Sequence, residues 1–260
     1  MKDRITKWIK DYAERANMRN LVVGISGGID SAVVSTLCAR TGINTIAVTM
    51  PIRQRPDLHD LSMRQGQWLT QTFNNVFHEV VDLTTVFDQF ETALLTCNSK
   101  YDSTLAFANS RARLRMTTLY QIAQSRQGIV VGTGNKVEDF GVGFFTKYGD
   151  GGVDISPIGD CLKTEVWDMG RELGVLQEII DAAPTDGLWN DKRTDEDQLG
   201  MSYPDLERAM ANDRLDRQCV YDTLPLPLDK TEKAQLKKYR DIRRRNLHKM
   251  EPIPVFKKGF

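Results

Sequence analysis

The part of the chain best suited to chemistry is the glycine turn at residues 26–28. Residues 21–25 form a short apolar run rich in β-branched side chains, which predicts a buried parallel strand. The turn breaks that run, and a helical pattern begins at Asp30. Consecutive glycines let the backbone turn sharply and approach a ligand, and the helix N-terminus behind them directs unpaired N–H groups and a positive dipole end toward it. The pattern therefore predicts an anion site suited to a phosphate.

The residues of this turn, Ser-Gly-Gly-Ile-Asp-Ser at positions 26–31, distinguish it from two commoner phosphate loops. It lacks the lysine that G-x-x-x-x-G-K-[ST] requires, and it is not G-x-G-x-x-G. It resembles the pyrophosphate loop of the ATP pyrophosphatases, which split ATP between its α- and β-phosphates and hold the departing pyrophosphate. In that family the aspartate, here Asp30, helps to hold magnesium. The alternative is a plain glycine turn in which Asp30 is a first-turn acid favoured by the helix dipole.

A second informative stretch covers residues 132–138 and 143–154. It combines glycines, lysines and carboxylates with aromatic side chains. Such a segment is too polar for a core and too aromatic for a plain linker, so it indicates a binding loop. The alternative is a glycine-rich surface turn.

Three arginines, Arg111, Arg113 and Arg115, lie within five residues of the longest expected helix. A run of charges usually forms a solvated face. The guanidinium group also makes paired hydrogen bonds to phosphates and carboxylates. Both interpretations are open on the residues alone.

The order and spacing of several long strings resemble those of the ammonia-dependent NAD synthetases. The strings are Ser-Gly-Gly-Ile-Asp-Ser, Arg-Ala-Arg-Leu-Arg-Met, Gly-Thr-Gly-Asn-Lys-x-Glu and Phe-Thr-Lys-Tyr-Gly-Asp-Gly-Gly-Val-Asp-Ile. Residues 183–189 and 194–200 match that family as well, so the resemblance covers nearly the whole chain. One departure is Met-Pro-Ile-Arg-Gln at residues 50–54, where many members have Met-Pro-Tyr-Gly. The resemblance therefore does not indicate whether that loop contacts ATP, although Arg53 could make such a contact.

The resemblance implies a two-step amidation with ATP. The nicotinate carboxylate of deamido-NAD attacks the α-phosphate to give an adenylated acyl intermediate, and ammonia then displaces AMP. The implied ATP site contains Gly24, Ile25, Ser26, Gly27, Gly28, Ile29, Asp30, Ser31, Thr133, Lys163 and Thr185. Asp30 and Glu138 are the implied Mg²⁺ ligands, since carboxylate oxygens suit this ion. The implied contacts to deamido-NAD are Arg113, Lys147, Asp154, His248 and Lys249, some of them across the interface of a homodimer.

Two residues carry the catalytic roles that the resemblance implies. Lys163 supplies the positive charge that the transferred phosphoryl oxygens require. Ammonia is mostly protonated at neutral pH, so a nearby carboxylate can attract the cation and accept its proton, and Asp150 is the candidate by family analogy. Lys163 could instead be a solvated lysine at a helix start, and His248 and Lys249 could belong to a solvated or nucleic-acid-binding basic run.

The elements that must position these residues alternate along the chain. Helical patterns are expected at residues 3–17, 31–40, 60–74, 86–97, 103–126 and 230–245, and strands at residues 21–25, 44–50, 75–81, 128–132 and 153–155. This alternation predicts an α/β fold with a doubly wound, parallel five-stranded sheet and helices on both faces. The resemblance further implies a Rossmann-like fold of the adenine-nucleotide alpha hydrolase type. We expect one domain over residues 1–260, with a basic helical appendage at about residues 223–260.

Composition excludes several classes of partner. The 260 residues include 35 basic and 35 acidic side chains, so no global field favours nucleic acid or an anionic membrane. No signal sequence and no run of about 18 apolar residues is present, which predicts a cytoplasmic protein. The four cysteines form no C-x-x-C pair, and only three histidines occur, so neither a zinc site nor a disulfide framework is expected.

Three alternatives concern the chemistry itself. Another pyrophosphate-loop enzyme, such as a tRNA thiolase or a GMP synthetase, would use the same turn, but a thiolase needs paired or persulfide-bearing cysteines and a basic RNA surface. A catalytically silent nucleotide-binding homologue would keep the motifs. A glutamine-dependent relative would add an amidohydrolase domain, whereas this chain begins one helix before its first strand. We therefore expect ammonia as the direct substrate, delivered free or by a separate glutaminase.

Overall fold

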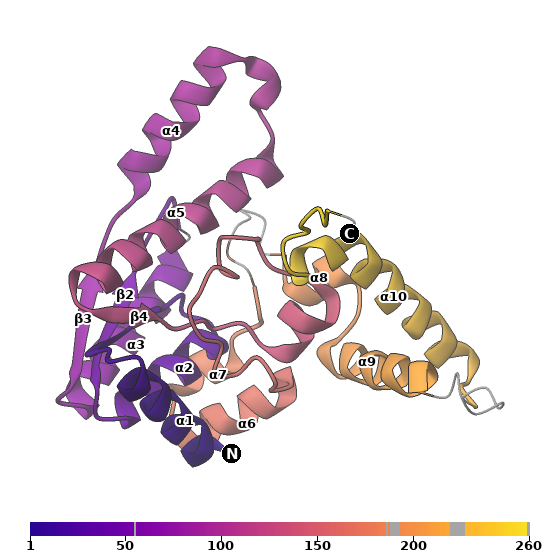
Figure 1. Ribbon diagram of the computed structural model, residues 1–260, viewed down its shortest axis with the longest axis horizontal. Helices are drawn as coiled ribbons and strands as arrows, with labels where there is room; N and C mark the ends of the chain where they lie inside the picture. Colours follow the sequence, from indigo (N-terminus) through magenta and orange to yellow (C-terminus); the bar gives the residue numbers. More distant parts are fainter. Residues whose placement is uncertain (55, 186, 188–192, 219–226, 259–260) are drawn as a thin grey trace.

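The structure, a computed structural model, describes residues 1–54, 56–185, 187, 193–218 and 227–258. Its centre is a parallel sheet in the order β3-β2-β1-β4 (Figure 1). The strands are β1 (Asn20–Gly24), β2 (Asn44–Thr49), β3 (Val76–Val80) and β4 (Gly128–Val130). The three central residues of β1 and all but the first residue of β2 are buried, as expected of strands covered on both faces. The first four expected strands are confirmed.

Helices cover both faces of this sheet. They are α1 (Lys2–Arg15), α2 (Ile29–Arg40), α3 (Pro56–Thr72), α4 (Thr84–Cys97), α5 (Thr104–Ser125), α6 (Lys163–Leu173) and α7 (Gln177–Asp181). The 3₁₀ helix η1 (Ser99–Tyr101) lies between α4 and α5 in the chain and has no buried residue. Because neighbouring strand residues point to opposite faces, Leu21 and Val23 pack with α1, α2, α6 and α7, whereas Val22 packs with α4 and α5. The doubly wound α/β fold is therefore confirmed. No described helix is both long and apolar enough to cross a membrane.

The expected fifth strand at residues 153–155 is reduced to a single parallel bridge between Val131 and Ile155. The backbone N–H of Gly132 donates to the carbonyl of Ile155, and the N–H of Asp154 donates to the carbonyl of Val130. The N–H of Val130 instead donates to the side-chain carboxylate of Asp154, at 2.8 Å. This side chain takes the place of the next backbone partner, so the ladder ends after one rung. The expected short strand at residues 153–155 is therefore present only as this bridge, and the sheet of the described residues has four parallel strands, not five.

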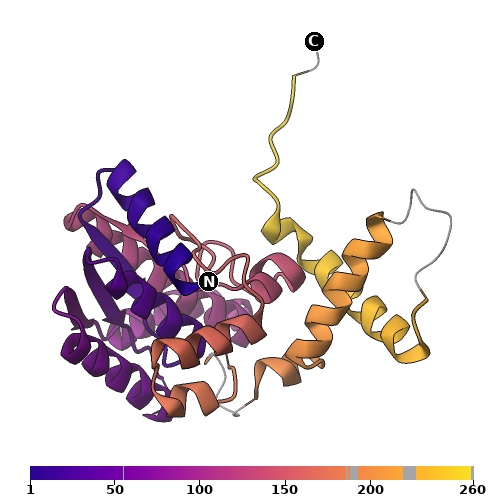
Figure 2. The same ribbon diagram turned by 90° about the horizontal axis from the view of Figure 1, so that it is seen from below.

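A further apolar cluster lies beside the sheet and its helices. It joins the π-helix η2 (Lys136–Val142), α8 (Asp195–Leu199), α9 (Tyr203–Gln218) and α10 (Lys230–Met250). Figures 1 and 2 show α9 and α10 side by side at one end of the molecule. The helix expected at residues 230–245 is confirmed as α10, which begins with a capping box formed by Asp229 and Glu232. Residues 223–226 and 259–260 of the expected appendage lie outside the described residues, and the single domain over residues 1–260 stays a prediction.

Candidate active site

The glycine turn has the predicted strand-turn-helix geometry. Gly27 adopts φ of +87°, and a Cβ there would lie 2.7 Å from the carbonyl oxygen of Leu58 in α3, so both conformation and space require glycine. The Ser31 hydroxyl accepts the N–H of Ser26 at 3.1 Å and donates to the carbonyl of Gly28 at 2.9 Å. Gly28 is the N-cap residue of α2. The turn is thus held by its own residues at the carboxyl end of β1, where ligands bind in open α/β sheets.

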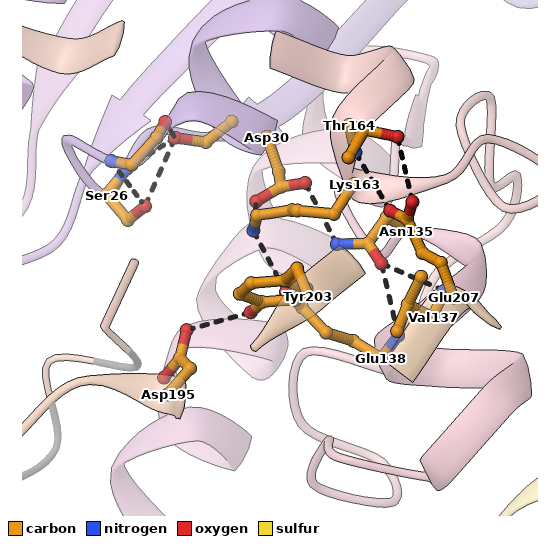
Figure 3. Close-up of polar contacts among 12 residues, drawn as sticks. Ser26, Asp30, Asn135, Val137, Glu138, Lys163, Thr164, Asp195, Tyr203 and Glu207 are labelled. Atoms are coloured by element: carbon orange, nitrogen blue, oxygen red, sulfur yellow. Dashed lines mark hydrogen bonds and ion pairs between the residues drawn. The ribbon is translucent and has the colours of Figure 1, made fainter. Parts of the chain in front are cut away.

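A buried ammonium group lies between two carboxylates next to this turn (Figure 3). Lys163 Nζ is 2.5 Å from Asp30 Oδ2 and 2.9 Å from Glu138 Oε1. The Lys163 side chain is 2% exposed, and those of Asp30 and Glu138 are 17% and 16% exposed. Three predicted site residues from α2, η2 and α6 therefore meet at one point, although they are far apart in the sequence.

The three charges determine one another's ionisation. Burial would lower the pKa of Lys163, but the carboxylates of Asp30 and Glu138 outweigh burial and raise this pKa above its ordinary value. Burial raises the pKa of Asp30 against the opposing charge of Lys163. Burial would also raise the pKa of Glu138, but Lys163 and the hydroxyl of Tyr203 outweigh it and hold that pKa below its ordinary value. Lys163 is therefore an ammonium and Glu138 a carboxylate at neutral pH.

Asn135 fixes the relative positions of the two carboxylates. Its side-chain N–H donates to Asp30 Oδ1 at 3.1 Å. Its side-chain oxygen accepts the backbone N–H groups of Val137 and Glu138 at 3.0 and 3.1 Å, which makes Asn135 the N-cap of η2. One fully buried amide thus connects the helix that carries Glu138 with the helix that carries Asp30.

The donors around this point fit a magnesium ion. Asp30 and Glu138 direct hard oxygens at the same ammonium nitrogen, so a cation is already held between them. Among the described residues, no group of three histidine, cysteine or acidic side chains could hold a metal. Mg²⁺ is usually held by one or two carboxylates together with substrate phosphates and water, so a pair of carboxylates is a sufficient protein contribution.

A second group of predicted residues meets where the loop after η2 contacts α5 and α10. Arg113 Nε donates to the carbonyl of Lys147 at 3.2 Å, and Lys147 Nζ donates to the carbonyl of His248 at 3.0 Å. Lys249 Nζ donates to the carbonyl of Phe145 at 2.8 Å and lies over its ring. Four of the five residues expected to contact deamido-NAD therefore lie together. They form a basic patch to which Arg113, Lys147 and Lys249 contribute side chains and His248 a backbone carbonyl.

Two predicted carboxylates have structural contacts in addition to any role in the reaction. Asp150 accepts the backbone N–H of Thr146 at 2.9 Å and so closes the loop that carries it. Asp154 accepts the hydroxyl of Tyr120 at 3.0 Å and the N–H of Val130 described above. Asp154 therefore lies at the edge of β4. Neither of these two hydrogen bonds connects it to the basic patch.

The loop that departs from the family pattern is held from two sides. Arg53 pairs with Asp88 and Glu91 of α4, at 2.6 and 2.7 Å, and its guanidinium lies over the ring of Phe87. The Arg53 side chain therefore has protein partners and is not free for a contact to ATP. Arg115 donates to the carbonyl of Met50 and the side chain of Gln54, both at 2.9 Å. Burial, followed by the nearby charge of Arg111, lowers the pKa of Arg115 to about 10.

The remaining two ATP candidates are on loops. Thr133 lies between the bridge at Val131 and the N-cap Asn135. Thr185 donates to the carbonyl of Arg193 and accepts the N–H of Gly187, both at 3.2 Å. Their roles stay predictions.

Comparison with known proteins identifies the family. The family model for NAD synthase matches residues 1–252. The chain belongs to the NAD synthase family. An NH(3)-dependent NAD(+) synthetase from Carboxydothermus hydrogenoformans is 38% identical over 209 residues, which are 80% of this chain and 83% of the relative. One from Methanococcoides burtonii is 37% identical over 256 residues, 95% of this chain and 91% of the relative. The solved structure of an NMN synthetase from Francisella tularensis aligns with a TM-score of 0.82 and 29% identity, covering 100% of this chain and 97% of that one.

Two residues of the candidate active site of this NAD synthase family member were not predicted from the sequence. Asn135 lies inside the string Gly-Thr-Gly-Asn-Lys-x-Glu, and its N-cap position three residues before Glu138 was the available signal. Tyr203 Oη lies 2.5 Å from Glu138 Oε1, although 65 positions separate the two residues. Local pattern contains no signal for that contact, because it depends on how α9 packs against η2.

Proposed function

We propose that this chain is an ammonia-dependent NAD(+) synthetase that amidates deamido-NAD with cleavage of ATP to AMP and pyrophosphate. The observation that carries the proposal is Lys163 between Asp30 and Glu138, directly beside a phosphate turn that lacks the kinase-type lysine. The curated relatives described above bear the same name. Membership of this family argues against the tRNA thiolase and GMP synthetase alternatives.

In the first step the chain has to bind the triphosphate of ATP and the pyrophosphate that leaves. Residues 24–31 would bind the phosphates through backbone N–H groups and the N-terminal end of α2. Thr133 and Thr185 would contact ATP, and Lys163 would offset charge on the phosphoryl oxygens as the bond between the α-phosphorus and the bridging oxygen breaks. Mg²⁺, held by Asp30 and Glu138, would neutralise phosphate charge.

In the second step ammonia attacks the acyl carbon and AMP leaves with the former carboxylate oxygen. Asp150 would attract ammonium and accept the proton that it loses. The basic patch of Arg113, Lys147, His248 and Lys249 would hold the phosphates of deamido-NAD, with Asp154 as a further contact. Deamido-NAD is an anion with two phosphate groups, so a cluster of cationic side chains suits its binding.

An NMN synthetase is the second candidate, because the alignment with the Francisella tularensis structure covers the full chain at a TM-score of 0.82. The two reactions differ in whether the acid carries an adenylate half. Both convert a nicotinate carboxylate to an amide, so the carboxylate and lysine cluster would serve either.

The first prediction tests both the reaction and its substrate. Purified protein with ATP, Mg²⁺ and ammonium should form NAD from deamido-NAD faster than NMN from nicotinate mononucleotide, and each amide should appear with one AMP and one pyrophosphate. Chromatography of nucleotides with a pyrophosphate assay measures both. Formation of ADP and inorganic phosphate would contradict the assignment, and a preference for the mononucleotide would favour the second candidate. No amide from either acid would support the catalytically silent alternative.

The second prediction concerns the nitrogen source. Ammonium should support turnover, and glutamine in ammonia-free solution should give almost no NAD, since the relatives are named as NH(3)-dependent. The same enzyme preparation with ammonium added afterwards is the control for activity. Equal rates with glutamine and ammonium would overturn direct use of ammonia.

Three expectations go beyond these assays. Homodimerisation, delivery of ammonia by a separate glutaminase and a cytoplasmic location follow from the resemblance and from the composition, and all three stay predictions.

A further inference from the structure

We infer that Tyr203 is a positioning residue that orients Glu138 and Lys163 for the nucleotide and its metal, an inference that rests on the proposed function. Tyr203 is fully buried at the start of α9. Its hydroxyl lies 2.5 Å from Glu138 Oε1, and its ring lies under Lys163 Nζ, 4.9 Å from the ring centroid. One side chain thus contacts two of the three charged groups in the cluster (Figure 3).

The ring of Tyr203 is held in place independently of those charges. Its backbone N–H donates to Glu196 Oε1 of α8 at 2.8 Å, and its ring packs edge-on against Trp167 of α6, with centroids 5.8 Å apart. The hydrogen bond to α8 therefore holds the backbone of Tyr203 and the contact with α6 holds its ring, and the ring fixes the direction of its hydroxyl. A rigidly held donor of this kind determines the orientation of the carboxylate that accepts from it.

The hydroxyl faces a second carboxylate as well. Asp195 Oδ2 lies 3.3 Å from Tyr203 Oη, farther than Glu138 Oε1. A phenol has one proton to donate, so the shorter contact assigns it to Glu138. Removal of the hydroxyl would leave the Glu138 carboxylate held at Oε1 by Lys163, with one donor fewer to determine its rotation.

This arrangement predicts which property a change at Tyr203 affects. Loss of a hydrogen-bonding partner behind a metal ligand typically weakens metal affinity or activity by about ten- to a hundredfold. The effect should appear in the binding of nucleotide and metal, because Tyr203 contacts Glu138 and Lys163. Binding of ammonium, which we assign to Asp150, should change little.

The Tyr203→Phe variant tests the inference with a single oxygen removed and the ring retained. Tyr239→Phe is the matched control, because Tyr239 is also buried and its hydroxyl donates to the carbonyl of Gly141 at 3.4 Å, not to a carboxylate. Binding of Mn²⁺ with α,β-methylene-ATP, followed by electron paramagnetic resonance, reads the site without turnover. Michaelis constants for ATP and ammonium, and thermal unfolding, complete the comparison.

We expect Tyr203→Phe to bind Mn²⁺ about tenfold more weakly and to raise the KM for ATP by a similar factor, with little change in the KM for ammonium. Tyr239→Phe should resemble the wild type in Mn²⁺ binding and in the KM values for ATP and ammonium. Unchanged Mn²⁺ binding in Tyr203→Phe, or an equal loss in Tyr239→Phe, would overturn the inference. Because the Mn²⁺ measurement needs no product, it still decides the role of Tyr203 if the wild type makes no NAD and the proposed function fails.

Discussion

Replacement of Asp30 by asparagine, or of Glu138 by glutamine, is expected to lower turnover on the order of 10²- to 10³-fold, as loss of a group that stabilises developing charge usually does. Each change keeps the shape of the side chain and removes its negative charge. The nucleotide site then has one carboxylate where we propose that two hold the metal. Initial rates at limiting and saturating Mg²⁺ measure the effect, and excess Mg²⁺ should recover part of the loss.

The same two variants should also be less stable. Lys163 is 2% exposed and would keep one carboxylate partner out of two. A hydrogen bond to a charged group contributes about 1.5–3 kcal/mol, so the free energy of unfolding should fall by roughly that amount in denaturant titration.

Asp160→Asn is the matched control for both measurements. Asp160 forms a pair with Lys136 at 2.7 Å, but its side chain is 95% exposed. Exposed pairs contribute about 0–1 kcal/mol, so this variant should retain its activity and nearly all its stability. Full turnover of either cluster variant at limiting Mg²⁺ would remove that residue from the proposed metal site.

The parts of the fold that could be predicted are those with a strong local pattern. The apolar runs that form β1 and β2 are buried on both faces, and the glycine turn between β1 and α2 is where its residues indicated. The amphipathic pattern of the first helix was equally clear, with Ile9 and Ala13 buried on one face of α1. These elements follow from side chains close together in the sequence.

The parts that could not be predicted depend on contacts between distant segments. The short run at residues 153–155 has a strand-like composition, but the side chain of Asp154 competes with the backbone for the N–H of Val130. Arg53 has the charge expected of a phosphate ligand, and only the position of α4 reveals that Asp88 and Glu91 neutralise it. Tyr203 reaches Glu138 because α9 packs against η2, which no periodicity encodes.

Replacement of Lys163 by methionine is the second change with a large expected effect. The variant should lose turnover on the order of 10²- to 10³-fold, because the cation proposed to offset phosphate charge is gone. It also leaves the carboxylates of Asp30 and Glu138 facing one another without the ammonium that now lies 2.5 and 2.9 Å from them. Like charges held together in a partly buried site destabilise the fold, so the metal-free variant should unfold at a lower temperature.

Divalent metal should restore part of that stability, since a cation that binds only the folded protein stabilises it by mass action. Thermal unfolding with and without Mg²⁺ is the measurement, and the Mg²⁺-induced rise in Tm should be larger in Lys163→Met than in the wild type, where the ammonium already lies between the carboxylates. Lys136→Met is the control, because Lys136 pairs with the exposed Asp160 and should respond to Mg²⁺ as the wild type does. A smaller or equal Mg²⁺ response in Lys163→Met would mean that the two carboxylates do not bind the metal between them, and the assignment of Asp30 and Glu138 as its ligands would fail with it.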